Sequence, residues 1–281
     1  MSFARLCAFL AAIAGLVGLV VGEGAACNLK PGDRLTVREV LDGQSLVLAD
    51  GREAVLAGIN VPKPGEGRGQ YADEARALVA DLLRGGAHIA YGKAREDRYG
   101  RPTIFPLLAD GRTLQARLVA DGLARVMSSP DNRICTDELL ALEAEARAAH
   151  RGLWRDPYFA VIAATDLTRL RRAEGRFAIV EGIVADAAFL RGRLYVNFGD
   201  DRRTDFTVTV APAAAKLFQN GVWTSIPDQP KSLVGQTMRV RGFIGSFNGP
   251  EIAATHPEQI EFPEHGREAA KGDGRERQSS H

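Results

Sequence analysis

A short polar segment at residues 97–101, Asp-Arg-Tyr-Gly-Arg, places two guanidinium groups, a carboxylate and a phenol around one glycine. An alternating segment at 87–91 precedes it and an apolar segment at 103–108 follows, so the pattern predicts a β-hairpin with residues 97–101 at its tip. Such a tip can direct an arginine into a groove. The alternative is a surface turn held by a local salt bridge between Asp97 and Arg101.

Four further motifs accompany this turn in a fixed order. They are Val-Leu-Asp-Gly at 40–43, Leu-Ala-Gly-Ile-Asn-Val-Pro at 56–62, Leu-Val-Ala-Asp-Gly-Leu-Ala-Arg-Val at 118–126, and Glu-Ala-Glu-Ala-Arg at 143–147 with Gly-Leu-Trp at 152–154. Together the five motifs resemble the staphylococcal-nuclease-like (thermonuclease) family over about residues 33–157, and within it the exported two-domain bacterial members. The resemblance implies that Arg101 is a phosphate-binding arginine.

The hydrophobic patterns predict a mainly β protein with helices, of the α+β class. Over 33–157 we expect an OB-type five-stranded barrel with interleaved helices. Its strands are expected at 34–41, 45–49, 52–59, 87–91 and 103–108, and its helices at 71–83, 114–120 and 136–151. Thr136 is the expected N-cap of the last helix. Trp154 is interpreted as a core anchor for that helix.

A second unit is expected after a helical linker at 158–174. Strand patterns across 175–262 predict another small OB-like β-barrel domain. In its strand at 194–198, alternate apolar residues face one way and Tyr195 and Asn197 face the other. Arg239 and Arg241 share one face of a later strand, and Tyr195 is expected on the same sheet surface, a mixture that single-stranded nucleic-acid sites use. The alternative is a solvated strand face. His256 is interpreted as structural.

The amino-terminal pattern predicts export. Residues 1–26 have a charged start, an apolar stretch and small residues before Cys27, as in a cleaved signal peptide. An uncleaved anchor and a lipid on Cys27 are the alternatives. We therefore expect a periplasmic or secreted protein without a stable membrane span after signal removal. Cys27 and Cys135 are expected to form a disulfide there, and 263–281 to be a disordered tail.

The family resemblance implies calcium-dependent phosphodiester hydrolysis, and the metal positions can be checked one by one. Calcium is held by carboxylate and carbonyl oxygens. The family's two calcium carboxylates fall on Gln44 and Asn60, which are neutral amides. A third position, which lends only its backbone carbonyl, falls on Val61. We therefore expect no cofactor, or calcium only if the site has been rearranged, with Asp42 as a candidate ligand.

The catalytic positions are also substituted. The general base falls on Lys63, whose ammonium group does not accept a proton near neutral pH unless strongly desolvated. The first phosphate arginine falls on Val55, and only Arg101 retains the family residue. Loss of a positioned base alone typically removes a factor of about 100 to 10,000 in rate. The sequence therefore predicts a catalytically degenerate protein.

Three functions follow from this pattern. The leading hypothesis is an exported binding protein for single-stranded nucleic acid or another anion, with Lys63, Arg98, Tyr99 and Arg101 lining the groove. The net charge of +1 requires any nucleic-acid contact to be local. The second hypothesis is a calcium-dependent DNA or RNA phosphodiesterase with a rearranged site. The third is an interaction module that binds cell-envelope proteins.

The rearranged site of the second hypothesis needs substitutes for the missing base and the missing arginine. Glu66 is the candidate base, and Arg52 or Arg68 the candidate arginine.

Overall fold

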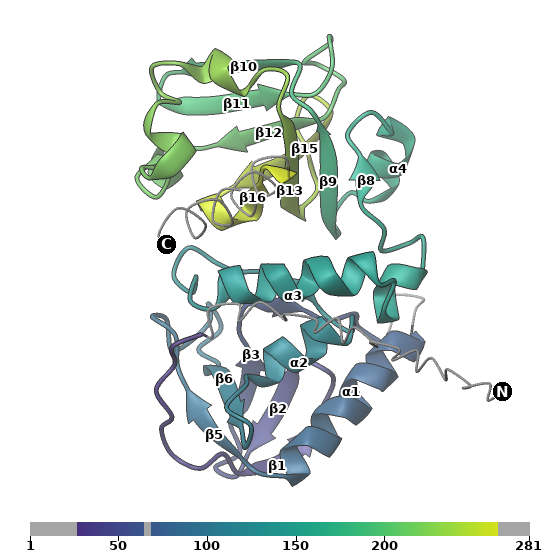
Figure 1. The fold of residues 1–281 in the computed structure, drawn as a ribbon, viewed down its shortest axis with the longest axis vertical. Helices are drawn as coiled ribbons and strands as arrows, with labels where there is room; N and C mark the ends of the chain where they lie inside the picture. Colours follow the sequence, from purple (N-terminus) through teal and green to yellow (C-terminus); the bar gives the residue numbers. More distant parts are fainter. Residues whose placement is uncertain (1–26, 65–68, 264–281) are drawn as a thin grey trace, which may run out of the picture.

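The computed structural model describes residues 27–64 and 69–263. It contains two β units, with helix α3 (Thr136–Ala148) lying across the space between them (Figure 1). The predicted signal segment and all but the first residue of the predicted tail lie outside the described residues. Within the described part, no helix is both long enough and apolar enough to cross a membrane.

The first unit is a curled five-stranded sheet with strand order β1-β2-β3-β6-β5, partly closed by the short pair β4 and β7. Its elements are β1 Val37–Val40, β2 Ser45–Leu48, β3 Glu53–Leu56, β4 Ile59–Asn60, α1 Gly69–Arg84, β5 Ala87–Ala90, β6 Thr103–Leu108, α2 Leu114–Ala120, β7 Arg125–Val126, α3 and the 3-10 turn η1 Gly152–Arg155. β3 and β6 run parallel, and the other sheet neighbours run antiparallel. The predicted OB-type barrel with helices is confirmed.

Apolar residues fix this arrangement. Strand β2 is buried along its whole length, and its Leu46 and Leu48 pack in the same core as helix α1. Helix α1 buries Ala72, Ala75 and Val79, which recur at three- and four-residue spacing. Gly43 lies where a side-chain carbon would approach Ala75 to 2.6 Å, so the first hairpin turn packs directly on α1.

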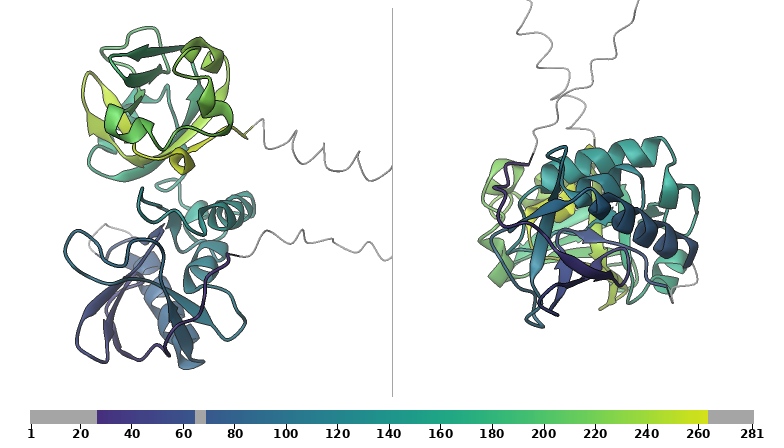
Figure 2. Two further views of the ribbon diagram at one scale, coloured as in Figure 1. Left: turned by 90° about the vertical axis from the view of Figure 1, so that its left-hand side faces the viewer. Right: turned by 90° about the horizontal axis from the view of Figure 1, so that it is seen from below.

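The second unit is a smaller barrel made of two sheets, with orders β10-β11-β12-β15-β14 and β16-β13-β9-β8. Its elements are β8 Ile162–Ala163, α4 Leu167–Arg172, β9 Phe177–Ile183, β10 Asp186–Leu190, β11 Arg193–Asn197, β12 Thr207–Val210, α5 Pro212–Ala215, η2 Gly221–Thr224, η3 Pro230–Leu233, β13 Thr237–Phe243, β14 Gly245–Ser246, β15 Pro250–Ala254, η4 Pro257–Gln259 and β16 Ile260–Glu261. The chain passes from one sheet to the other between β9 and β10, and between β13 and β14. The unit has its own apolar core, and its strands curl around it as a separate body from the first unit (Figure 2).

Two local predictions are wrong. The predicted helical linker at 158–174 is not one helix, because Ile162 is buried and pairs in parallel with β9. Asp166 accepts a hydrogen bond from the Arg169 amide and starts the short helix α4 there. Thr136 is not an N-cap. Its hydroxyl donates to the Arg133 carbonyl, and Cys135 occupies the cap position in the left-handed region, with φ of 66°.

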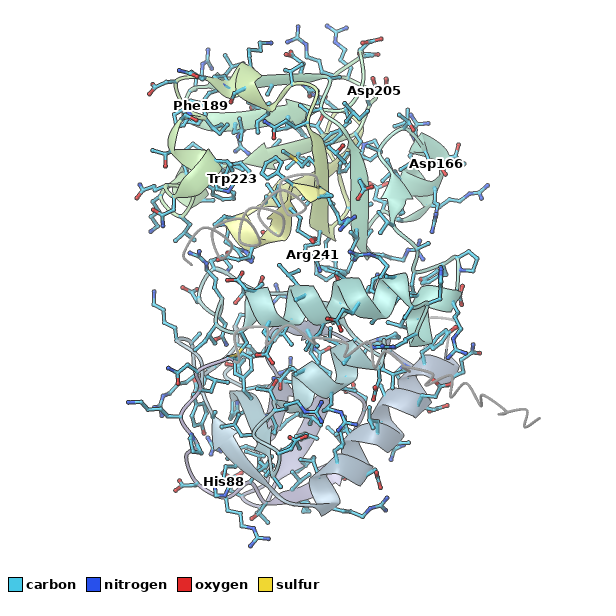
Figure 3. The ribbon with its side chains drawn as sticks, in the orientation of Figure 1. His88, Asp166, Phe189, Asp205, Trp223 and Arg241 are labelled. Atoms are coloured by element: carbon cyan, nitrogen blue, oxygen red, sulfur yellow. A yellow bond between two sulfur atoms is a disulfide. The ribbon has the colours of Figure 1, made fainter. Side chains whose placement is uncertain are left out.

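A buried ion cluster joins the two units. Arg241 on β13 lies 2.9 Å from Glu143 on α3 and also pairs with Glu261 on β16. The Arg241 side chain is 1% exposed and that of Glu143 is 0% exposed. Burial alone would lower the pKa of Arg241, but the charges of Glu143 and Glu261 raise it. Figure 3 shows Arg241 directed from the second barrel toward α3.

The prediction for the arginine strand is wrong. Arg239 and Arg241 lie on β13 in one sheet, and Tyr195 lies on β11 in the other. Arg241 does not form a solvated face either, because its partners hold it between the two units. Alternation within one strand shows which residues share a face, but it cannot show whether a second unit covers that face.

Further side chains complete the contact between the units. His256 is buried, and its Nε2 atom lies 2.7 Å from the Ser128 hydroxyl, in agreement with its interpretation as structural. Burial lowers the pKa of His256 to about 4, so its imidazole is neutral at pH 7. Arg133 and Glu258 form an ion pair beside it. Trp154 is buried against Phe177 of the second barrel, so it anchors this contact as well as α3.

Cys27 and Cys135 are joined by a disulfide in the structure, with Cα atoms 4.9 Å apart. The bond attaches the first described residue to the start of α3, which carries the contact between the units. We expect the protein isolated from cells to contain this bond, and its reduction to lower the free energy of unfolding by about 2–5 kcal/mol. Mass spectrometry of nonreduced peptides checks the pairing. Free thiols, or a lipid on Cys27, would contradict it.

Candidate functional site

The turn between β1 and β2 places Asp42 beside the expected metal position, but its carboxylate is fully engaged. One oxygen accepts the backbone amides of Gln44 and Ser45 at 2.7 and 2.6 Å, and the other accepts the Lys63 ammonium at 2.8 Å. Burial alone would raise the pKa of Asp42, but the hydrogen bond from Lys63 and the backbone amides hold it below its ordinary value. Asp42 therefore organises its own turn and neutralises Lys63.

Gln44 fills the position of the first calcium carboxylate with a buried amide. Its side-chain NH₂ donates to the Ile59 carbonyl at 2.7 Å, and its oxygen accepts the Val61 amide at 3.4 Å. The side chain thus bridges the start of β2 to strand β4 and the residue after it. Where the family has an anionic oxygen, this chain has a hydrogen-bond donor directed at a backbone carbonyl.

Asn60, at the second calcium carboxylate position, is bound by a cation. Its side-chain oxygen accepts Arg125 Nη2 at 2.7 Å, because β4 pairs with β7 and sets Asn60 opposite Arg125. Arg125 also donates to the Phe177 carbonyl of the second barrel at 2.9 Å. Arg125 was expected only as part of the motif at 118–126, and no strand was predicted at β7, so its contact with Asn60 was missed.

These residues do not fit a calcium ion. Calcium needs several converging oxygens, whereas here an amide NH₂, an ammonium and a guanidinium group are directed at the available oxygens. In the described ranges 27–64 and 69–263, no group of three or more histidine, cysteine, aspartate or glutamate residues is placed to hold a metal.

Arg101 lies at the hairpin tip as predicted, and two carboxylates bind it. Its guanidinium pairs with Glu53 of β3 at 2.6 Å and with Asp97 at 2.8 Å. Burial alone would lower the pKa of Arg101, but the hydrogen bonds that its guanidinium donates to Asp97 and Glu53 raise it. The local salt bridge to Asp97 was the predicted alternative. Glu53 was missed, because only the parallel pairing of β3 with β6 brings it to the turn.

Of the other predicted groove residues, only Tyr99 lies beside Arg101, whose guanidinium carbon is 5.5 Å from the centre of the Tyr99 ring. Arg98 donates to the Tyr99 hydroxyl at 2.6 Å, and both side chains lie at the exposed tip. Lys63 pairs with a different carboxylate, Asp42. Val55, at the first phosphate-arginine position, is half-buried on β3, opposite Ser45 of β2.

The alternative site residues are not assembled either. Arg52 pairs with Asp50 on the surface, at 2.7 Å. Glu66 and Arg68 lie outside the described residues.

Comparison with known proteins agrees with the fold of the first unit. Residues 53–156 match the model of the family described as staphylococcal nuclease homologue. The chain is also 30% identical over 163 residues to Protein ParB of Escherichia coli, and this match covers 55% of the chain and 88% of that protein. The chain therefore belongs to the staphylococcal nuclease homologue family.

Proposed function

We propose that this family member is an exported binding protein for nucleic acid that does not hydrolyse phosphodiesters. The observation that carries the proposal is that internal partners occupy the polar side chains at the family's catalytic and metal positions. Gln44 bonds backbone groups, Lys63 pairs with Asp42, and Arg125 binds Asn60.

The charges around Arg101 support the proposal that the protein does not hydrolyse phosphodiesters. One guanidinium faces two carboxylates, so this part of the groove carries a local charge of −1. Phosphoryl transfer needs fixed positive charge where negative charge develops in the transition state. A phosphate approaching Arg101 must displace Glu53 or Asp97, and the displaced carboxylate would then repel it.

Export is supported by the amino-terminal pattern and by the disulfide at Cys27 and Cys135, since such bonds persist in oxidising compartments. Membership of a nuclease family supports nucleic acid as the ligand class, although the fold alone does not fix function.

Two measurements on the full mature chain test the proposal. We expect no cleavage of labelled single-stranded DNA or RNA at millimolar calcium, the same result as with a chelator. We also expect calcium not to raise the melting temperature, since an ion bound only to the native state would stabilise it by mass action.

Calcium-dependent cleavage that is lost in Arg101→Ala would contradict the proposal and favour the phosphodiesterase hypothesis. So would a rise of several degrees with calcium but not potassium, abolished in Asn60→Ala. Absence of both cleavage and oligonucleotide binding would instead favour a protein ligand of the cell envelope.

A further inference from the structure

The outer surface of the second barrel carries a hollow of about 290 Å³ over strands β10, β11 and β12. Tyr195 and Asn197 of β11 and Thr207 and Thr209 of β12 line it. The residues between them on these strands turn inward to the core, as the alternation predicted for β11. The hollow is therefore a sheet face, at the end of the molecule away from the first barrel (Figure 1).

Two aromatic side chains and an aliphatic one give this face an apolar surface open to solvent. Tyr195 lies in the middle of the sheet, opposite Ala188 on one side and Thr209 on the other. Phe247, in the turn between β14 and β15, is 66% exposed, and Leu190 is 57% exposed. Small neighbours such as Ala188 leave the Tyr195 ring free to stack on a planar group.

Four arginines surround these aromatics. Arg202 and Arg203 line the hollow itself, and Arg191 and Arg193 line an adjoining hollow that shares Tyr195. None of their guanidinium groups forms an ion pair within the described part of the chain, in contrast to Arg101.

The carboxylates on this face are already engaged. Asp186 pairs with Lys231, and Glu251 accepts a hydrogen bond from the Thr209 hydroxyl. Arg202 and Arg203 also interact electrostatically with Asp186 and Asp201, respectively, whereas the adjoining hollow has no carboxylate in its lining. The positive charge of this face is therefore least offset at Arg191 and Arg193.

We propose that this face binds single-stranded nucleic acid, with a base stacked on Tyr195 or Phe247 and the backbone phosphates on the arginines. Aromatic platforms beside a cationic track are the means by which proteins hold single strands without sequence preference. A duplex fits poorly, because its base faces are already stacked inside the helix. The inference deepens the proposed function by giving the ligand a site, and that site lies outside the family-matched residues 53–156.

The test is fluorescence anisotropy of the full mature chain with labelled dT₁₂ and rU₁₂. Phe247→Ala and Tyr195→Leu should each weaken binding by about 5- to 150-fold, the usual effect of losing one stacked base. Tyr195→Phe keeps the ring and should bind as the parent does. Phe243→Ala is the matched aromatic control, because Phe243 is 58% exposed but lies outside the hollow.

The charge contribution is measured by the salt dependence of binding. Arg202→Gln with Arg203→Gln should reduce the slope of log K against log salt by about 1.4, at about 0.7 for each phosphate contact on a single strand. The control is Arg171→Gln with Arg172→Gln, which removes the same charge from exposed positions on α4 and should leave the slope near that of the parent. Comparing dT₁₂ with rU₁₂ identifies whether DNA or RNA is preferred.

Four results would overturn the inference: no binding by the parent chain, equal binding of a duplex, equal binding of an abasic oligonucleotide, or unchanged affinity in both Phe247→Ala and Tyr195→Leu. In the last case the protein still binds nucleic acid and only the assigned site is wrong. Calcium-dependent cleavage, by contrast, would contradict the proposed function without affecting this site.

Discussion

Replacing Arg241 by methionine should lower the free energy of unfolding by about 3–5 kcal/mol, because it removes the buried cation that lies closest to two carboxylates. Among the described residues, only the longer pairs with Arg147, at 3.3 Å, and Arg239, at 3.6 Å, would then remain. Glu143 is fully buried, and Glu261 is half-buried beside it. Burial alone would raise the pKa of Glu261, but the charge of Arg241 keeps it low, so this carboxyl is ionised at neutral pH. The methionine side chain fills much of the volume of the arginine side chain. The decrease in the free energy of unfolding therefore reflects the missing charge more than a cavity.

Chemical denaturation and calorimetry of the full chain provide the measurement. Arg84→Met is the matched control, because Arg84 forms an exposed ion pair on α1 and its loss should cost at most about 1 kcal/mol. Since Arg241 and Glu143 belong to different barrels, we also expect the variant to unfold in two steps rather than one.

A double-mutant cycle with Glu143→Gln isolates the interaction energy between Arg241 and Glu143 from the contributions of neighbouring residues. The two changes together should cost less than the sum of the single changes, because the double variant leaves no unpaired charge between these two residues. If Arg241→Met and Arg84→Met lowered the free energy of unfolding equally, the buried cluster would contribute no more to stability than a surface ion pair.

Calcium-dependent nuclease activity should appear when the four substituted positions receive the family's side-chain types. The combined variant carries Gln44→Asp, Asn60→Asp, Lys63→Glu and Val55→Arg. Two of these changes remove the amide bridge and the ammonium that are directed at oxygens in this structure. Val55 is only half-buried, so a longer side chain at β3 has access to solvent.

All four changes should be needed together, since catalytic groups that act as a unit are strongly non-additive. Restoring a positioned base and a charge-stabilising donor is worth about 100 to 10,000 and about 100 to 1,000 in rate, respectively. Cleavage of a labelled single-stranded oligonucleotide with calcium and with chelator measures the gain, and circular dichroism checks folding. Adding Arg101→Ala to the variant should abolish the activity.

Two neighbouring side chains should limit the nuclease activity of the combined variant. Arg125 should pair with the carboxylate introduced at position 60, and Glu53 still binds Arg101. Adding Glu53→Gln should therefore raise the rate further. A well-folded variant that does not cleave, with or without this fifth change, would show that the groove itself has diverged and not only its side chains.

Much of the fold follows from local patterns. The alternation in β11, the helical spacing in α1 and the glycine-containing hairpin tip each depend on residues close in sequence, and the structure agrees with them. Strand β2 departs from alternation because it is buried along its whole length. The helical pattern predicted at 158–174 was too long, because the buried Ile162 pairs with strand β9 instead.

The sequence by itself determined the family, the barrel class and the substitutions at Gln44, Asn60, Lys63 and Val55. Only the tertiary structure decided what those side chains bind. Arg125 reaches Asn60 across 65 residues, and Arg101 reaches Glu53 across 48. The physical reason is that the energy of an ion pair or hydrogen bond depends on separations of a few ångströms and on burial. Strand register and barrel closure set those quantities between segments far apart in the chain, so the residue types alone do not specify the partners.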